Sequence, residues 1–295
     1  MTTAEVAGVE ISRPDKVLFP GSRDRKAVTK LDLATYYDAI ADVMLPHLRG
    51  RPVNMQRFPD GVGAMAFYEK KVPSHFPDWV HTVEVHTEDG TQRQVVVDDR
   101  RSLVYLAQQA CITPHTWLCT NKSLEKPDQL VFDLDPDEGL DVEDVRKAAL
   151  EFHAKLDELG LANFVKVSGG KGYHIIVPLK PKADWDTVKG FTNDFAQAMV
   201  QAAPDRYTAT LSKKARKGKI FIDYLRNGKG STTVAPYSSR AKKGATVSMP
   251  VTWEMVADGV GPADFAMGDA ATGKLLKAAD PWTDFFKRGK PLDRR

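Results

Sequence analysis

One short stretch, QLVFDLDP at residues 129–136, ends an apolar run with two aspartates one residue apart. Its composition predicts a β-strand, in which successive side chains point to opposite faces. Asp133 and Asp135 are therefore expected side by side on one face of a sheet, while Phe132 and Leu134 share the other face. Two adjacent carboxylates repel each other unless a cation, above all a metal ion, lies between them or one acid stays protonated.

The remaining periodicities predict an α+β protein with a mainly antiparallel or mixed sheet, because hairpin-like neighbours outnumber strict strand–helix alternation. Strands are expected over 51–58, 64–72, 81–89, 91–99, 115–120, 129–136, 163–167, 173–179 and 219–225. Helices are expected over 29–48, 101–111, 141–160, 184–202, 252–259 and 262–267. We expect one catalytic domain over residues 1–295, in which an N-terminal subregion, 1–125, packs on a catalytic core, 126–295.

Composition excludes several classes of protein. The chain is 42% hydrophobic, but no run reaches the eighteen or so apolar residues of a membrane span, so we expect a cytoplasmic protein with no membrane partner. Cys111 and Cys119 lack a CxxC spacing and are expected to be reduced and structural. Between Arg206 and Lys243 there are eleven lysines and arginines and one acid, which is typical of a polyanion-binding surface or of a solvated loop.

The single acid in that basic segment, Asp223, ends the apolar strand IFID, and it gives the chain a third carboxylate in such a position. Three carboxylates are what a two-metal phosphoryl-transfer site uses. A glycine-rich turn, SGGKGYH, joins two strands at residues 168–174. Its N–H groups, the Ser168 hydroxyl and Lys171 are suited to bind a phosphate, with His174 beside them, although a plain glycine-rich hairpin has the same composition.

Other families also use an apolar strand followed by DxD. A haloacid-dehalogenase-type phosphatase uses its first aspartate as a nucleophile, but the position that should be Thr or Val is Asp137 in this chain. A DxD glycosyltransferase binds a nucleotide sugar through one metal. Neither alternative explains the glycine-rich turn, Asp223 and the basic segment together.

The chain contains DLD, then SGGKGYH, then an aspartate after hydrophobic residues. With its motifs in this order, the sequence resembles the archaeo-eukaryotic primase superfamily, specifically the polymerase domain of bacterial LigD and its stand-alone relatives. The resemblance extends over nearly the whole chain and includes RPDKVLFP, RPVNMQRFPDG, AFYEKKVP, the segment ending in His115 and a DPW near the C-terminus. It implies a primase-type fold and a template-dependent polymerase that adds NTPs or dNTPs to a primer 3′-hydroxyl with two Mn²⁺ or Mg²⁺ ions.

The resemblance also implies roles for individual residues. Asp133, Asp135 and Asp223 would be catalytic and would bind the metals. Residues expected at the incoming nucleotide are Ser168, Lys171, His115, Arg240, Phe67, Tyr68 and Arg57. Gln56 departs from the basic residue that is usual in the family before Arg57.

The DNA contacts implied by the resemblance lie at two places. Lys16, Lys30 and Arg13 would bind the 5′-phosphate on the far side of a gap, and Arg216 and Arg226 would line the DNA surface. The expected partners are DNA with short gaps or ends, NTPs or dNTPs, a separate DNA ligase and an end-binding protein, at work on the bacterial nucleoid. A module that binds DNA ends without catalysis is the alternative.

Overall fold

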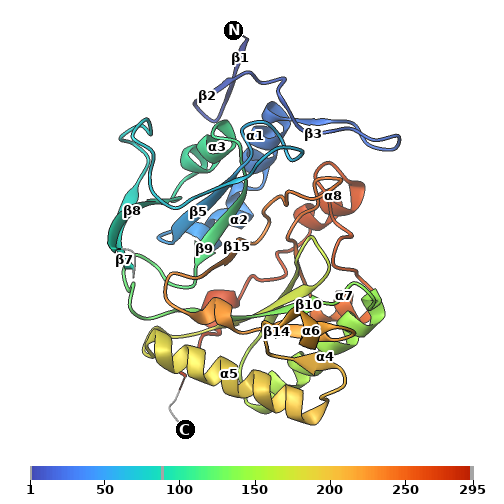
Figure 1. The fold of residues 1–295 in the computed structure, drawn as a ribbon. Coiled ribbons are helices and arrows are strands. Elements are labelled where there is room, and N and C mark those ends of the chain that lie inside the picture. Colours follow the sequence, from blue (N-terminus) through green and yellow to red (C-terminus); the bar gives the residue numbers. More distant parts are fainter. Residues whose placement is uncertain (1, 88–89, 293–295) are drawn as a thin grey trace.

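The computed structural model describes residues 2–87 and 90–292 and contains two large β-sheets (Figure 1). The sheet that holds the DLD strand has the order β13–β14–β10–β12–β11–β16. Its strands are β13 (Tyr207–Thr208), β14 (Ile220–Asp223), β10 (Gln129–Pro136), β12 (Tyr173–Pro178), β11 (Phe164–Val167) and β16 (Pro250–Val251). Only the β13–β14 pair is parallel within this sheet, which confirms the predicted mixed, mainly antiparallel arrangement.

The second sheet has the order β15–β9–β5–β8–β7, and β6 also pairs with β5. Its strands are β15 (Thr232–Val234), β9 (Cys111–Trp117), β5 (Pro52–Arg57), β8 (Gly90–Val96), β7 (Thr82–Thr87) and β6 (Phe67–Glu69). All of its pairs are antiparallel. Because β15 comes from the C-terminal half of the chain, the second sheet combines segments from both sides of residue 125, and the division at that residue remains a prediction.

Two small hairpins stand at the N-terminal end: β1 (Thr3–Val6) with β2 (Val9–Ser12), and β3 (Val17–Phe19) with β4 (Val28–Thr29). The helices of the N-terminal half are α1 (Lys30–Ala39), α2 (Ala41–Leu48) and α3 (Arg100–Gln108). Those of the C-terminal half are α4 (Val142–Glu158), α5 (Trp185–Ala202), α6 (Lys213–Arg216), α7 (Trp253–Ala257) and α8 (Ala270–Lys277), with 3₁₀ turns η1 (Leu225–Asn227) and η2 (Phe285–Lys287).

The alternation predicted for the DLD strand is present in the structure. Phe132 packs on Phe152 of α4 and Phe195 of α5, with ring centroids 5.5 and 4.9 Å apart. These two helices therefore cover the apolar face of β10, below the sheet in Figure 1. Asp133 lies on the opposite face, because adjacent residues of a strand alternate.

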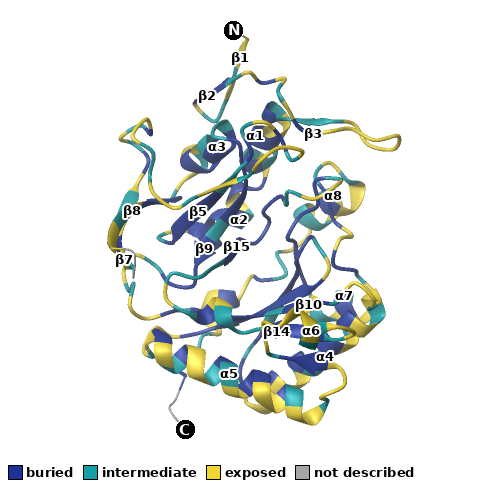
Figure 2. Cartoon of the chain, in the orientation of Figure 1, coloured by how far each residue is buried: buried dark blue, intermediate teal, exposed yellow. Residues whose placement is uncertain are grey.

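The hydrophobic core is continuous through both halves. One cluster of buried side chains runs from Val9 to Leu292, and a smaller one joins Trp117 of β9 to Val131 of β10 and Ile176 of β12. Figure 2 shows β5, β9 and β10 largely buried, β8 partly exposed and the outer face of α5 exposed. The smaller cluster fixes the two sheets to each other beside Asp133, since Val131 shares its face.

Several predicted elements differ from the structure in their limits. The helix expected over 29–48 is divided in two at Ile40, whose ψ of 2° is not helical. The expected helix over 262–267 is wrong: this segment forms turns and an isolated bridge at Ala266, and the helix α8 begins later. The strand expected over 115–120 is shifted to Cys111–Trp117, and the end of the one expected over 81–89 lies outside the described residues.

Helix α4 confirms the predicted start and stop signals. Asp141 accepts a hydrogen bond from the Asp144 N–H at 2.9 Å, and Gly160 has a φ of +67° just after the helix. None of the described helices has the length and apolar character that a membrane crossing requires.

Candidate active site

The three predicted catalytic carboxylates lie on two neighbouring strands. Asp133 of β10 is the direct partner of Asp223 of β14 and, on its other side, of His174 of β12. Asp135, two residues along β10, lies on the same face as Asp133. The structure therefore brings all three carboxylates to one end of the β10–β14 pair.

Asp133 and Asp223 are the enclosed members of the three, with side chains 21% and 14% exposed, whereas the Asp135 side chain is 56% exposed. Burial raises the pKa of Asp133 from 3.8 to about 6, and Asp223 and Asp135 act in the same direction while Arg226 opposes them. His174 Nε2 lies 3.4 Å from Asp133 Oδ1. Burial, followed by Lys166 and Arg240, lowers the pKa of His174 well below its usual value, so this contact joins a neutral imidazole to the acid.

Arginines hold the other two acids. Arg226 Nε lies 3.0 Å from Asp223 Oδ2, and Arg216 Nη1 lies 3.9 Å from Asp135 Oδ2. Arg216 also stacks on the Phe221 ring, 3.5 Å from its centroid. The two arginines predicted to face DNA thus lie at the carboxylates themselves and reduce the repulsion among them.

The carboxylates suit divalent metal ions by their chemistry. Mg²⁺ and Mn²⁺ prefer carboxylate oxygens and water, and Asp133, Asp135 and Asp223 supply only such oxygens. In the described part of the chain, no three His, Cys, Asp or Glu side chains are already gathered into a metal-binding cluster. Asp135 and Asp223 each contact an arginine, so each of these two carboxylates already has a separate cationic partner.

The glycine-rich turn lies directly against the DLD strand. A Cβ on Gly172 would meet the Leu134 carbonyl oxygen at 1.8 Å, so only glycine fits there. The Ser168 hydroxyl accepts hydrogen bonds from the N–H groups of Gly170 and Gly172 at 3.1 and 3.2 Å. The turn thus engages the N–H groups of Gly170 and Gly172 internally, and phosphate binding by the turn stays a prediction. The exposed Lys171 ammonium, 3.3 Å from Glu138, is the cation that this turn presents.

Arg240 lies beside this turn, and His115 lies close enough to Arg240 to be affected by its charge. Arg240 donates a hydrogen bond to the Ser168 carbonyl at 2.9 Å. Burial, then the positive charges of Arg240, Arg226 and Lys166, lowers the pKa of His115 to about 3. The Tyr68 ring lies 5.9 Å from the His115 ring between centroids. Tyr68 and Phe67 are 62% and 52% exposed, which is unusual for aromatic side chains and is the exposure that base stacking requires.

Unpartnered polar atoms mark the face of the second sheet beside His115. Within the described residues, His115 Nε2, Asn54 Oδ1, Gln94 Oε1 and Trp117 Nε1 are buried without a hydrogen-bond partner. Asn54 is the direct strand partner of His115, and Trp117 lies two residues further on the same face. Buried polar groups without partners are rare and point to a ligand or water. The sequence does not predict a role for Asn54, because its position opposite His115 depends on strand register.

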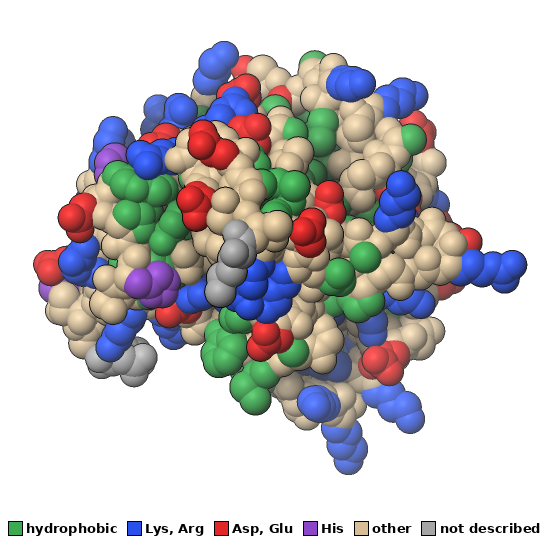
Figure 3. Space-filling view, turned by 90° about the horizontal axis from the view of Figure 1, so that it is seen from above, with side chains coloured by type: hydrophobic (Ala, Val, Ile, Leu, Met, Phe, Trp, Pro, Cys, Tyr) green, Lys and Arg blue, Asp and Glu red, His purple; other side chains and the backbone are tan. Residues whose placement is uncertain are grey.

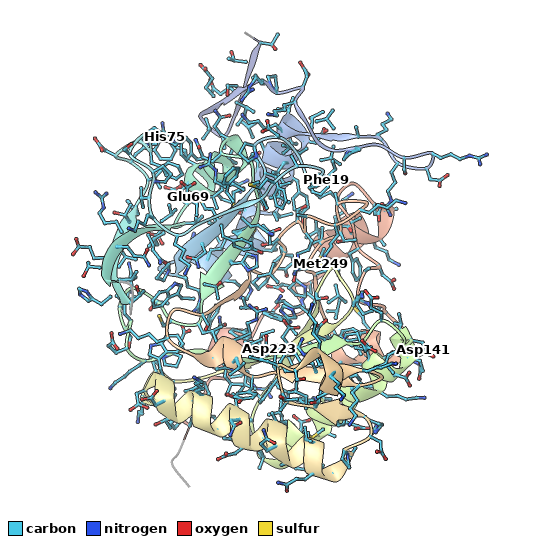
Figure 4. The ribbon with its side chains drawn as sticks, viewed as in Figure 1. Phe19, Glu69, His75, Asp141, Asp223 and Met249 are labelled. Atoms are coloured by element: carbon cyan, nitrogen blue, oxygen red, sulfur yellow. The ribbon has the colours of Figure 1, made fainter. Side chains whose placement is uncertain are left out.

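Arg57 has a different environment from the predicted one. It forms an ion pair with Glu69 on β6, and its Nε donates to the Gln109 carbonyl at 2.8 Å. Glu69 follows the aromatic pair directly, and Figure 4 shows it in the upper part of the molecule, away from Asp223. The guanidinium therefore fixes β6 to its surroundings.

The predicted 5′-phosphate residues also lie together, at the N-terminal end of the molecule. Lys30 is the first residue of α1, and its ammonium donates to the Ser12 carbonyl at 2.7 Å. Burial, then Arg13 and Lys16, lowers the pKa of Lys30 to about 8. Lys16 forms an ion pair with the exposed Asp60 at 2.9 Å. Arg13 and Lys16 lie close enough to Lys30 to lower its pKa, so these three residues form a local cationic site. Seen from this end, Lys and Arg side chains are spread among acids over the surface (Figure 3).

Comparisons with known proteins agree with this geometry. Residues 29–282 match the family model described as LigD, primase-polymerase domain. The chain is 37% identical over 284 residues to the multifunctional non-homologous end joining protein LigD of Pseudomonas aeruginosa, covering 96% of this chain and 33% of that protein. It is 31% identical over 274 residues to the bifunctional non-homologous end joining protein LigD of Bacillus subtilis, covering 92% of this chain and 43% of that protein.

A solved structure gives the same result for the fold. The polymerase domain from Mycobacterium tuberculosis Ligase D, in complex with DNA, superposes with a TM-score of 0.86 at 31% identity, covering 95% of this chain and 99% of that one. The chain spans less than half the length of the curated relatives compared above. The predicted primase-type fold is confirmed, and the chain belongs to the LigD primase-polymerase domain family.

Proposed function

We propose that this protein is a template-dependent nucleotidyltransferase that repairs short DNA gaps and broken ends. The observation that carries the proposal is the meeting of Asp133, Asp135 and Asp223 at one end of a strand pair. A separate site, which is cationic and lies around Lys16 and Lys30, is at the N-terminal end. One site suits transfer at a 3′-hydroxyl, and the other suits a 5′-phosphate.

The carboxylates would hold two divalent ions, Mn²⁺ or Mg²⁺. Bound ions of this kind neutralise the triphosphate and lower the pKa of the attacking hydroxyl. Asp223, which lies opposite Asp133, would accept the proton of the 3′-hydroxyl. Arg226 and Arg216, now paired with Asp223 and Asp135, would turn to DNA phosphates when cations take over the acids.

The incoming NTP or dNTP would lie between the glycine-rich turn and the second sheet. Lys171 and Arg240 supply positive charge for the triphosphate, and the Ser168 hydroxyl lies at the turn between them. His115 and the exposed aromatics Phe67 and Tyr68 would contact the sugar and base. For Arg57 we propose a supporting role, because it holds β6 and thereby the aromatic pair.

The site at the N-terminal end would orient the substrate. Lys16, Lys30 and Arg13 place three cations around the start of α1, where a helix N-terminus also favours an anion. Binding the downstream 5′-phosphate there would set the gap length that the carboxylates can reach. A filled gap remains a nick, so a DNA ligase must follow, and an end-binding protein would assist at broken ends in the cytoplasm, on the nucleoid.

The test is primer extension on a duplex with a gap of one to three nucleotides, with and without the downstream 5′-phosphate, in the presence of Mn²⁺ and either NTPs or dNTPs. Templated addition should disappear in Asp133→Ala and should lose its dependence on the 5′-phosphate in Lys16→Ala. Tight DNA binding without any addition by the unmodified protein would replace the proposal with a non-catalytic end-binding module. Phosphate release from small esters without a template would indicate the phosphatase alternative.

A further inference from the structure

A row of four polar side chains crosses the catalytic sheet. Lys166 of β11, His174 of β12, Asp133 of β10 and Asp223 of β14 are successive register partners on four neighbouring strands. Directly opposed residues in antiparallel strands have side chains on the same face and in contact. The row therefore runs from the two acids, through the His174 imidazole, to the Lys166 amine.

Lys166 is the least expected member of the row. It is 1% exposed, and lysine is almost never buried so completely without a partner. Its Nζ lies 2.7 Å from Ser248 Oγ and 3.0 Å from His174 Nδ1. Because the Ser248 hydroxyl donates its proton to the Val167 carbonyl at 3.1 Å, Ser248 can only accept from Lys166. The amine is thus anchored on one side and directed at the imidazole on the other.

The contacts of His174 set the position of its proton. Burial, then Arg240, lowers the pKa of Lys166 well below its usual value. As an ammonium or as a neutral amine, its Nζ carries hydrogens and can donate one to His174 Nδ1. The Thr233 hydroxyl also lies 3.3 Å from Nδ1 and can donate to it. In a neutral imidazole the remaining proton is then on Nε2, the nitrogen 3.4 Å from Asp133 Oδ1.

We propose that Lys166 is a positioning residue of the active site: it holds His174 in the tautomer that presents Nε2–H to Asp133. The 3.4 Å contact of Nε2 with Oδ1 would then fix the rotation of the Asp133 carboxylate and leave the second oxygen of this acid for a cation. Partners of this second layer commonly govern the affinity of a metal site. The role of Lys166 for a metal rests on the proposed function, whereas its effect on the His174 tautomer does not.

The first experiment therefore uses the protein without metal or nucleotide. In protein labelled with ¹⁵N on histidine, the imidazole shifts of His174, assigned from their loss in His174→Gln, report which nitrogen carries the proton. We expect a protonated Nε2 in the unmodified protein and a mixture of tautomers in Lys166→Met. Lys155→Met is the matched control, because this lysine pairs with Glu158 on the surface of α4. A protonated Nδ1 in the unmodified protein, or an unchanged tautomer in Lys166→Met, would overturn the proposal.

The second experiment measures Mn²⁺ binding by electron paramagnetic resonance. Affinity should fall by about 10- to 100-fold in Lys166→Met, in line with other positioning residues behind metal ligands, and should stay unchanged in the control. If Lys166→Met does not fold, Ser248→Ala removes only the hydroxyl that anchors the amine and should produce the same change of tautomer. A shifted tautomer with unchanged Mn²⁺ affinity would remove the role of Lys166 at the metal site, whereas no Mn²⁺ binding by any form would contradict the proposed function.

Discussion

Asp133 and Asp223 face each other as direct partners across the antiparallel strands β10 and β14, although they lie far apart in the sequence. Opposed side chains of this kind are close enough for each charge to act on the other. The raised pKa of Asp133, which burial causes first and Asp223 increases, is the electrostatic result. The pair is therefore stable at neutral pH only with cations nearby, a requirement that Arg226 meets in part.

The first prediction concerns this pair. Asp223→Asn keeps the size of the side chain but removes its charge and the proposed proton acceptor for the 3′-hydroxyl. Primer extension should fall by at least about 100-fold, equivalent to about 2.7 kcal/mol of transition-state stabilisation, while the Kd for gapped DNA changes little. Single-turnover extension and fluorescence anisotropy measure the two quantities separately.

Asp258→Asn is the control for this variant, because Asp258 is an exposed acid just after α7. It should extend primers at the rate of the unmodified protein. Retention of more than a tenth of the activity by Asp223→Asn would mean that the third carboxylate has no part in the chemistry.

A second prediction concerns stability. Asp133 has a folded pKa of about 6 against an ordinary value of 3.8, so the folded state binds more protons than the unfolded state between these values. The free energy of unfolding therefore decreases as pH rises through this window and stays reduced above it, by about 1–3 kcal/mol. Without metal, Asp133→Asn should raise the Tm at pH 7.5 by a few degrees.

A measurement at low pH is the control for this second prediction. Below pH 3.8 the acid is protonated in both states, so Asp133→Asn should no longer differ from the unmodified protein in scanning calorimetry. Equal or lower stability of Asp133→Asn at pH 7.5 would show that the ionised acid is already fully compensated by its neighbours.

The sequence predicted the class of fold and the strand of each carboxylate, because alternation within a strand is a local property. It could not predict that Asp133 lies opposite both His174 and Asp223, since register depends on which strands pair. For the same reason the sequence did not predict that Lys166 is buried or that Asn54 has an unpartnered oxygen. The expected helix at 262–267 failed because Ala266 instead bridges to Thr246, a tertiary contact without a local signal.

A third prediction uses the contact between the glycine-rich turn and the DLD strand. In Gly172→Ala the new methyl group would meet the Leu134 carbonyl oxygen at 1.8 Å, and both segments are backbone with little freedom to move. The free energy of unfolding should fall by about 3 kcal/mol or more, and extension should be lost because Ser168 and Asp133 are displaced. Gly139→Ala is the matched control, since a Cβ there meets nothing within 4 Å. Urea denaturation measures the stability of both variants. Equal midpoints for Gly172→Ala and Gly139→Ala would show that the turn is not packed against β10 as described.

The last prediction concerns the pH dependence of 5′-phosphate binding. Burial, Arg13 and Lys16 lower the pKa of Lys30 to about 8, so this ammonium loses its proton as pH rises through that value. The preference for 5′-phosphorylated over 5′-hydroxyl gapped DNA, measured by anisotropy, should therefore decline between pH 7 and 9.5, although the phosphate itself keeps its second charge above its pKa of about 6.

Arg13→Ala removes one repelling cation, so it should weaken the preference at pH 7 but move its decline to higher pH. Lys147→Ala, on the exposed side of α4, serves as the control. A preference that is constant from pH 7 to 9.5 in the unmodified protein would exclude Lys30 from the phosphate site.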